Sequence, residues 1–186
     1  MSRTLHNGSV VELVGRRWPG WTLPGTDGQH WSLAALDSPA VVYAYPRTGR
    51  PGEPHLTDDW PNIPGAMGCT AESCAFRDLH AEIIACGVAV FGLSSQDVDY
   101  QREMVSRLAL PYPVLSDTKL ELAAALGLPT FEVAGVRLLQ RLTMYIERGT
   151  VHHVWHPIPD PAGHPDEVLR WLAQRPTQTP HRVDTP

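Results

Sequence analysis

Apolar residues along this chain follow two spacings, which predict strands that alternate with helices. Val41–Tyr45 and Val88–Leu93 are unbroken apolar runs, as expected of strands buried on both faces of a sheet. Between them, Cys69–Ala85 carries apolar residues at intervals of three and four, and this spacing predicts a helix. The expected buried face of that helix consists of Phe76, Leu79, Ile83 and Ile84.

Shorter segments with the same two spacings complete the expected fold. A helix with an apolar residue at every fourth position is expected after Ser95. Asp117 is the expected N-cap of a later helix and Gly127 its end. The remaining expected elements are strands at Val10–Val14, Tyr112–Leu115, Leu138–Ile146 and Val151–Trp155, a small hairpin within Trp18–Leu36, and helices at Leu120–Leu126 and Pro165–Ala173. This order predicts an α/β fold with a central mixed sheet flanked by helices.

One long segment, Pro46–Gly68, shows neither spacing. Its 23 residues include five prolines and four glycines, so no regular element is expected there. Loops of this length inside a domain are uncommon and are usually functional or mobile. We therefore expect one domain over residues 1–174, with a long loop at 46–68. A polar, proline-rich stretch at 175–186 follows and is predicted to be a disordered tail.

The composition narrows the class of protein. A formal net charge of −5 with 19% charged residues argues against a nucleic-acid-binding protein. No apolar run approaches the roughly 18 residues of a membrane span, and residues 1–17 lack the apolar stretch of a signal peptide. Three cysteines are too few, and odd in number, for a disulfide-stapled secreted scaffold. We expect a cytoplasmic monomer or homodimer that binds neither nucleic acid nor membranes.

Cys69 is the first candidate for chemistry, because it lies where the long loop meets a predicted helix. A helix N-terminus carries unpaired N–H groups and about half a positive charge, which favour a thiolate over a thiol. A lowered pKa and a reactive sulfur are therefore expected for Cys69. The alternative is that Cys69 is simply a small apolar residue at the start of a helix.

Cys74 follows Cys69 by five residues, which on an intact helix separates the two Cα atoms by roughly 8.6 Å. A disulfide needs about 4.4–6.8 Å, so this pair can bond only if the first helical turns unwind. Oxidation of the pair would then be coupled to local unfolding. The alternative is that Cys74 packs against Phe76. Cys86 lies about 25 Å from Cys69 along the same predicted helix and is expected in the core.

The sequence around Cys69 resembles the active-site helix of the peroxiredoxins. Residues 68–78 read Gly-Cys-Thr-Ala-Glu-Ser-Cys-Ala-Phe-Arg-Asp, and this run is similar to the peroxiredoxin Q, or bacterioferritin-comigratory, group. Tyr45-Pro46, Gly92-Leu93-Ser94 and Leu115-Ser116-Asp117 match the group in order, so the resemblance covers roughly residues 10–172. It implies a thioredoxin-like fold, with Cys69 as the peroxidatic cysteine and Cys74 as the resolving cysteine.

The resemblance also implies further site residues. The family holds the peroxide and the thiolate with an arginine on a late strand, and Arg141 is the candidate here, with Arg137 in reserve. Without the resemblance, Arg141 could equally be a solvated surface residue. Alternation along the strand would place Leu142, Met144 and Ile146 toward the core and Arg137, Arg141, Thr143 and Tyr145 on the opposite face. The residues expected to bind substrate are Pro46, Gly68, Thr70 and Glu72.

The loop departs from the family pattern, in which a proline and a threonine precede the cysteine by seven and three residues. Ala66 occupies the threonine position and has no hydroxyl to donate to the peroxide. Pro46 lies twenty-three residues before Cys69, as if about sixteen residues were inserted. The expected donor of the missing hydroxyl is Thr48, and the alternatives are Thr57 and Thr70.

The resemblance implies a thiol-dependent peroxidase that reduces hydrogen peroxide or organic hydroperoxides. Cys69 would take the peroxide oxygen, Arg141 would stabilise the charge, and Cys74 would close an intramolecular disulfide. A thioredoxin-like dithiol would then reduce that disulfide. No cofactor is expected, because sulfur carries the electrons. No metal is expected either, because His152 and His156 lack further ligands at zinc-like spacing.

Two other functions stay open. The first is a redox-responsive binding protein, in which the Cys69–Cys74 pair acts as a switch with little turnover. The second is a thiol–disulfide oxidoreductase that acts on proteins, although the chain lacks a CxxC motif.

Overall fold

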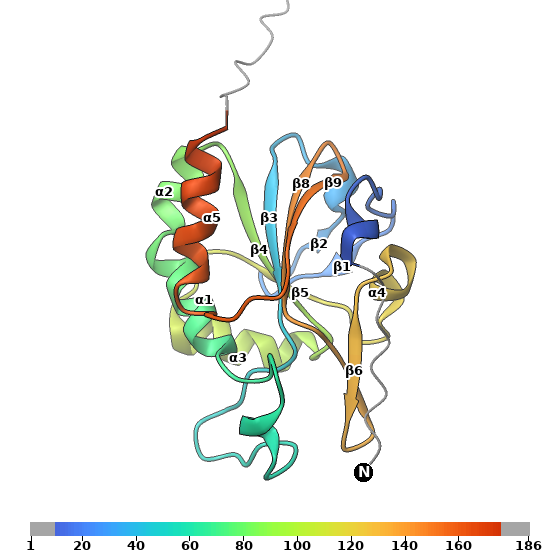
Figure 1. The fold of residues 1–186 in the computed structure, drawn as a ribbon, viewed down its shortest axis with the longest axis vertical. Coiled ribbons are helices and arrows are strands. Elements are labelled where there is room, and N and C mark those ends of the chain that lie inside the picture. Colours follow the sequence, from blue (N-terminus) through green and yellow to red (C-terminus); the bar gives the residue numbers. More distant parts are fainter. Residues whose placement is uncertain (1–9, 176–186) are drawn as a thin grey trace, which may run out of the picture.

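Five strands form the central sheet in the computed structural model, which describes residues 10–175 (Figure 1). Their order across the sheet is β5-β4-β3-β8-β9. The central strand β3 runs parallel to β4 and antiparallel to β8, so the expected mixed sheet is confirmed. The strands are β3 (Ala40–Ala44), β4 (Ala89–Ser94), β5 (Val114–Ser116), β8 (Leu142–Glu147) and β9 (Thr150–Trp155).

Both faces of β3 are buried, because side chains alternate along a strand and each face of the sheet is covered. Val41 and Tyr43 belong to one apolar cluster, whereas Val42 and Ala44 belong to the other. The first face packs against α1 (Cys69–Asp78), α2 (His80–Ala85), α3 (Val98–Leu108) and α5 (His164–Ala173). The second face is covered by α4 (Glu121–Leu126), the hairpin of β1 (Leu23–Pro24) and β2 (His30–Trp31), and 3-10 turns at Val10–Leu13 and Leu33–Ala35.

The long segment 46–68 has a small apolar cluster of its own. It contains one 3-10 turn, Trp60–Asn62, and packs on a second hairpin, which consists of β6 (Thr130–Val133) and β7 (Val136–Leu139). Trp60 and Ala66 from the loop meet Phe131 and Leu138 from the hairpin, and all four side chains are buried. The second half of the loop is therefore held against the body of the protein, next to the start of α1.

Two expected elements differ in the structure. Val10–Leu13 is a 3-10 turn rather than a strand, with Leu13 buried and the next residue, Val14, 52% exposed. The expected helix Cys69–Ala85 is two helices that meet at Leu79, where ψ is 9°. Ile83 is fully buried, and Ile84 is 46% exposed instead of lying on the buried face, because adjacent residues of a helix point about 100° apart.

The expected strand Leu138–Ile146 is also two strands. Its first half, β7, pairs with β6 in the separate hairpin, and its second half, β8, joins the central sheet. The break falls at Gln140 and Arg141, where the chain crosses from one sheet to the other. Thr143 and Tyr145 are buried like Leu142 and Met144, because helices also cover the face of the sheet opposite to Leu142 and Met144.

The chain ends and the caps agree with expectation in part. Gly127 ends α4 with a left-handed φ of 75°, and the Asp117 carboxylate accepts from the Leu122 and Ala123 N–H groups, although Leu120 is the N-cap. Arg175, expected to begin the tail, lies over the Tyr145 ring; the rest of that expected tail, 176–186, is outside the described residues. Within residues 10–175, no helix is long and apolar enough to cross a bilayer.

Candidate active site

Cys69 is the first residue of α1 and is only 2% exposed. The preceding residue, Gly68, has a left-handed φ of 95°, and a Cβ built on it would lie 2.8 Å from Pro161 Cγ. Glycine is therefore required here both by the backbone conformation and by the close approach of Pro161. This turn brings the end of the long loop directly onto the helix N-terminus that carries the sulfur.

Arg141 is the positively charged group that contacts the Cys69 sulfur. Its Nη2 donates to Sγ at 3.1 Å and also to the carbonyl oxygens of Gly65 at 3.2 Å and Met67 at 2.8 Å. The Cys69 thiol donates weakly to the Ala66 carbonyl oxygen at 3.5 Å. Arg141 thus holds the last turn of the loop and the sulfur with one side chain, and it is 4% exposed rather than solvated.

Glu72 lies one turn into α1 and forms a buried ion pair with Nη1 of Arg141. Burial raises the pKa of the Glu72 carboxyl to about 7, although the Arg141 charge and hydrogen bond lower it. Within the described chain, Glu72 Oε1 and Arg141 Nε are buried without a hydrogen-bond partner. One guanidinium therefore contacts two acidic groups, the Glu72 carboxyl and the Cys69 thiol.

The balance of charge and burial at Cys69 differs from the expectation for an isolated helix start. Burial raises the pKa of the Cys69 thiol, and the negative charge of Glu72 adds to this rise. Arg141 and a hydrogen bond from the Arg47 backbone N–H lower the pKa. The expected net lowering is wrong for this closed arrangement, because the helix start is buried; reactivity depends on the donors that face the sulfur.

A cavity of about 420 Å³ opens next to Cys69. Much of its lining comes from the long loop and is apolar. Thr48 and Thr70 are among the polar groups on its wall. The apolar lining side chains from the loop are Pro54, Leu56, Trp60, Ala66 and Met67. The site can therefore admit a small molecule to the sulfur along an apolar wall.

Comparisons with known proteins decide the family. The Redoxin family model matches residues 13–163. The chloroplastic peroxiredoxin Q of Suaeda salsa is 31% identical over 171 residues, which is 90% of this chain and 72% of that protein. The putative peroxiredoxin bcp of Coxiella burnetii is 30% identical over 161 residues, 84% of this chain and 95% of that protein. The chain belongs to the peroxiredoxin family.

Solved structures agree with this assignment. The peroxidoxin BcpB of Mycobacterium tuberculosis has a TM-score of 0.70 at 27% identity and covers 88% of this chain and 98% of its own. A peroxiredoxin Q of Xanthomonas campestris has a TM-score of 0.68 at 24% identity, which supports the fold. This peroxiredoxin has the expected thioredoxin-like fold and is a thiol-dependent peroxidase, so its substrate is a peroxide and a thiol reductant restores it. It spans 64% of the related Gentiana triflora protein.

The second cysteine of the motif, Cys74, lies in the middle of α1 and is partly buried. The neighbouring Ser73 is tied down by three hydrogen bonds. Its Oγ donates to the Cys69 carbonyl oxygen at 2.9 Å and accepts from Tyr43 at 3.0 Å, and its carbonyl oxygen accepts from Tyr112 at 2.7 Å. In this peroxiredoxin, a bond between Cys69 and Cys74 would require these contacts to break.

The expected hydroxyl donor, Thr48, is directed elsewhere. Its Oγ1 donates to Gln96 Oε1 at 3.2 Å, while Thr57 accepts from the Asp59 N–H at 3.4 Å. In the part of the chain that the structure describes, no threonine hydroxyl is hydrogen-bonded to the Cys69 sulfur. Arg137, the reserve for Arg141, is exposed on β7 and lies outside the site.

Sequence reasoning missed the Arg47 N–H and Gln96. A backbone N–H is present at almost every residue, so no sequence pattern singles out the one that faces a sulfur. Gln96 follows β4, and the carboxyl ends of parallel strands are where sites form in open α/β sheets. The position of Gln96 directly after a predicted strand is therefore the one signal in the sequence that could have pointed to it.

The remaining features are Cys86, a second cavity and His153. Cys86 caps the end of α2 and is partly buried at the edge of the cluster that contains Phe76. A second cavity, of about 660 Å³, lies between the loop, β6 and residues 156–161, and Met67, Gly68 and Arg141 are in its lining. His153 and Trp171 stack with a centroid separation of 4.7 Å, so His153 has a packing role.

Proposed function

We propose that this peroxiredoxin reduces hydrogen peroxide and organic hydroperoxides with Cys69 as the peroxidatic cysteine. The observation that carries the proposal is the approach of Arg141 Nη2 to Cys69 Sγ at 3.1 Å. Cys69 lines the 420 Å³ cavity, and Arg141 lines the neighbouring cavity of about 660 Å³. A buried guanidinium stabilises a thiolate and then the negative charge on a leaving oxygen. No other cysteine in the described chain contacts an arginine in this way.

The first step oxidises the sulfur by two electrons. The Cys69 thiolate attacks the terminal oxygen of ROOH, a sulfur–oxygen bond forms, and the oxygen–oxygen bond breaks. The alkoxide or hydroxide leaves and takes a proton, so that ROH or water is released and Cys69 becomes a sulfenic acid. Arg141 and the Arg47 N–H face the sulfur from which this charge moves.

The second step uses Cys74 as the resolving cysteine. The first turns of α1 unwind, the Cys74 thiol attacks the Cys69 sulfenic acid, water leaves, and an intramolecular disulfide forms. A thioredoxin-like dithiol then exchanges with this disulfide, returns two electrons, and restores both thiols. Support comes from the position of Cys74 on the same helix, five residues from Cys69 and outside the fully buried core.

The other motif residues shape the substrate site in this proposal. Gly68 permits the close turn onto α1, and Glu72 fixes the Arg141 guanidinium. Thr70 lines the cavity, and Pro46 is buried with its carbonyl oxygen accepting from Ser94 at 3.3 Å. Thr48 also lines the cavity, and its hydroxyl reaches a peroxide only by leaving Gln96.

The setting of the reaction completes the proposal. We take residues 1–174 as one catalytic domain, in a reducing compartment such as the cytoplasm, because the chain has few cysteines. Each group assigned above comes from a single chain, so the chemistry is the same for a monomer and for each subunit of a homodimer.

The test is peroxide-dependent NADPH oxidation with thioredoxin and thioredoxin reductase. We expect turnover by the wild type and by Cys86→Ser, and none by Cys69→Ser. Cys74→Ser should consume about one peroxide per chain and then stop, with a sulfenic acid on Cys69. An active Cys69→Ser variant would contradict the proposal. A wild type that forms the Cys69–Cys74 disulfide but does not turn over would support the redox switch instead.

A further inference from the structure

Gln96 forms hydrogen bonds to Thr48 with both the oxygen and the nitrogen of its side-chain amide. Its Oε1 accepts from the Thr48 N–H at 2.9 Å and from the Thr48 hydroxyl at 3.2 Å, and its Nε2 donates to the Thr48 carbonyl oxygen at 3.1 Å. Both residues are buried, Gln96 at 7% and Thr48 at 1% exposure. A neutral amide suits this position, because it offers an acceptor to the N–H and a donor to the C=O at once.

Gln96 is itself held by neighbours that belong to regular elements. Its N–H donates to Ser94 Oγ at 3.3 Å, and its carbonyl oxygen accepts from Gln101 Nε2 of α3 at 2.9 Å. The Gln101 Oε1 accepts from Tyr45 at 2.8 Å, just beyond β3. Gln96 therefore connects the start of the long loop to the ends of β3 and β4 and to α3 through buried hydrogen bonds.

The residue between the held positions is Arg47, which lines the same cavity as Cys69 and whose backbone N–H lowers the pKa of the Cys69 thiol. Pro46 is fixed on one side by Ser94, and Thr48 is fixed on the other side by Gln96. Because both neighbours of Arg47 are fixed, the direction in which its backbone N–H points is fixed as well. We propose that Gln96 is a positioning residue, which aims the Arg47 backbone N–H at the peroxidatic sulfur. This inference rests on the proposed role of Cys69.

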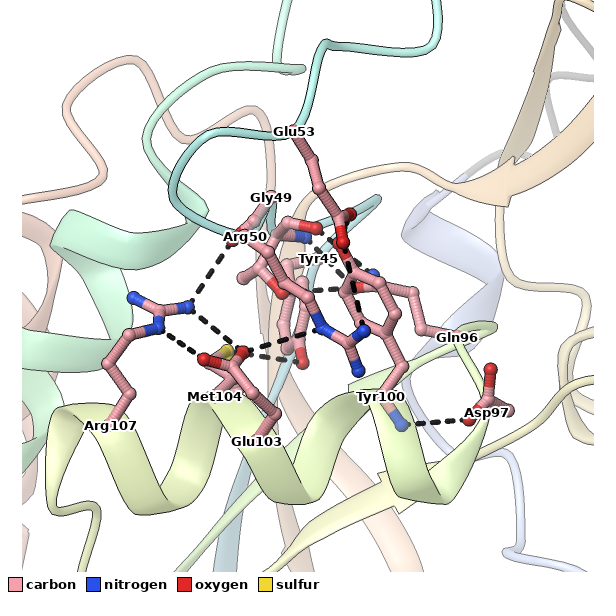
Figure 2. Close-up of polar contacts among 11 residues, drawn as sticks. Tyr45, Gly49, Arg50, Glu53, Gln96, Asp97, Tyr100, Glu103, Met104 and Arg107 are labelled. Carbon is pink, nitrogen blue, oxygen red and sulfur yellow. Dashed lines mark hydrogen bonds and ion pairs between the residues drawn. The ribbon is translucent and has the colours of Figure 1, made fainter.

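A second set of contacts holds the same loop but lies at the surface, as Figure 2 shows for Arg50, Glu53 and Arg107 above α3. Arg50 pairs with Glu103 at 3.7 Å, and Arg107 donates to the Gly49 carbonyl oxygen at 3.3 Å. The Arg50 and Glu103 side chains are 35% and 34% exposed, and ion pairs at such sites contribute little. Loss of this outer contact should leave Arg47 in place, so Glu103→Gln is the matched control for Gln96 variants.

The experiment follows the Cys69 thiol without any peroxide. In a Cys74→Ser, Cys86→Ser background, the rate of alkylation by iodoacetamide is measured from pH 5 to 10. Gln96→Met keeps the side-chain volume but removes all three bonds, and Gln96→Ala leaves room for a water molecule beside Thr48. We expect the alkylation profile of both variants to move to higher pH, with about a tenfold lower rate at pH 7. The Glu103→Gln profile should match the parent.

The Thr48→Val variant separates the effect of the two hydrogen bonds to the Thr48 backbone from the effect of the bond to its hydroxyl. It keeps the Gln96 bonds to the Thr48 N–H and C=O and loses only the hydroxyl bond, so its shift should be smaller than that of Gln96→Met. Superimposable profiles for the parent and both Gln96 variants would overturn the proposal. So would a Thr48→Val shift as large as theirs.

Melting curves establish that each variant is folded at the assay temperature. If Gln96→Met does not fold, the Gln96→Ala profile decides. The peroxidase assay is independent of this measurement. If turnover is absent in the wild type while the Gln96 variants still shift the alkylation profile, the proposed function fails and the positioning role stands.

Discussion

Two walls of the Cys69 pocket are held in opposite ways. The strand-end wall, residues Pro46–Thr48, is fixed by the side chains of Ser94 in β4 and Gln96 just after it, which take no part in any chemical step. The helix wall, residues Cys69–Cys74 of α1, is fixed by contacts that must break if Cys69 and Cys74 form the proposed disulfide. The site therefore combines a permanent donor array with a removable one, and each can be altered separately.

The permanent wall explains how a buried thiol remains reactive. Burial raises the pKa of Cys69, and the compensation comes from donors whose direction the protein has already fixed, so that none must be reoriented during the reaction. The helix wall, in contrast, must be able to come apart during the proposed reaction. Its hydrogen bonds must be strong enough to keep the Cys69 sulfur beside Arg141 and weak enough to allow resolution.

Arg141 holds the helix wall and the last turn of the long loop, and its removal should have the largest effect. Arg141→Gln deletes the Nη2 donor to Cys69 and the carbonyl contacts at Gly65 and Met67. We expect kcat/KM for peroxide to fall by about 10²- to 10³-fold, as for loss of a charged transition-state donor. Steady-state kinetics check this.

Two further variants make the Arg141 result interpretable. Arg137→Gln alters an exposed arginine on β7 and should keep the wild-type rate. Arg141→Gln with Glu72→Gln avoids a buried unpaired carboxylate, whose cost could unfold the single variant. If the folded double variant retains wild-type kcat/KM, Arg141 has no part in peroxide reduction.

Sequence patterns were sufficient for the removable wall but not for the permanent one. The helix start, the cysteine spacing and Glu72 all lie within residues 68–78, where local periodicity and the motif resemblance both apply. The strand-end wall depends on a backbone N–H and on Gln96, which is forty-nine residues away from Arg47 along the chain. Contacts of that range are set by strand pairing, which no local pattern reports.

The same limit explains the errors in the fold. The strands β3 and β4 were predicted because unbroken apolar runs mark strands that are covered on both faces. The segment Leu138–Ile146 was expected to be one strand, because the polar residues within it are Gln140, Arg141 and Thr143 and none of them is a glycine or proline that would mark a turn. The chain changes sheets at this point, where Arg141 also contacts the Cys69 sulfur, and no local pattern reports a tertiary contact of that kind.

A smaller effect should follow from loosening the helix wall alone. Tyr112→Phe removes the hydroxyl that donates to the Ser73 carbonyl oxygen at 2.7 Å and contacts Tyr43 at 3.2 Å. Loss of one such bond costs about 1 kcal/mol, so unwinding of α1 should become about fivefold more frequent. We expect the Cys69–Cys74 disulfide to form about fivefold faster after a peroxide pulse, as measured by quenched flow and mass spectrometry.

The same variant should leave the permanent wall untouched. The rate of sulfenic acid formation should therefore change little, and less Cys69 should be overoxidised to the sulfinic acid. Tyr145→Phe is the control, because the Tyr145 hydroxyl contacts Glu147 and not α1. Disulfide formation at the wild-type rate in Tyr112→Phe would show that these hydroxyls do not limit unwinding.

An effect on stability rather than on rate concerns Glu72, which shares Arg141 with the sulfur. In the folded protein its pKa is about 7, raised from 4.5 by burial, so the folded state binds a proton more tightly than the unfolded state. Below about pH 4.5 the carboxyl is protonated in both states. As the pH rises toward 7 the unfolded chain releases this proton first, so the free energy of unfolding falls, and above 7 it reaches a lower plateau. Glu72→Gln should flatten this decline in urea titrations between pH 4.5 and 7.5, whereas Glu132→Gln, at an exposed position, should not. Equal slopes in the wild type and Glu72→Gln would mean that the proton on Glu72 is not coupled to folding, and that Arg141 neutralises both acids of the helix wall.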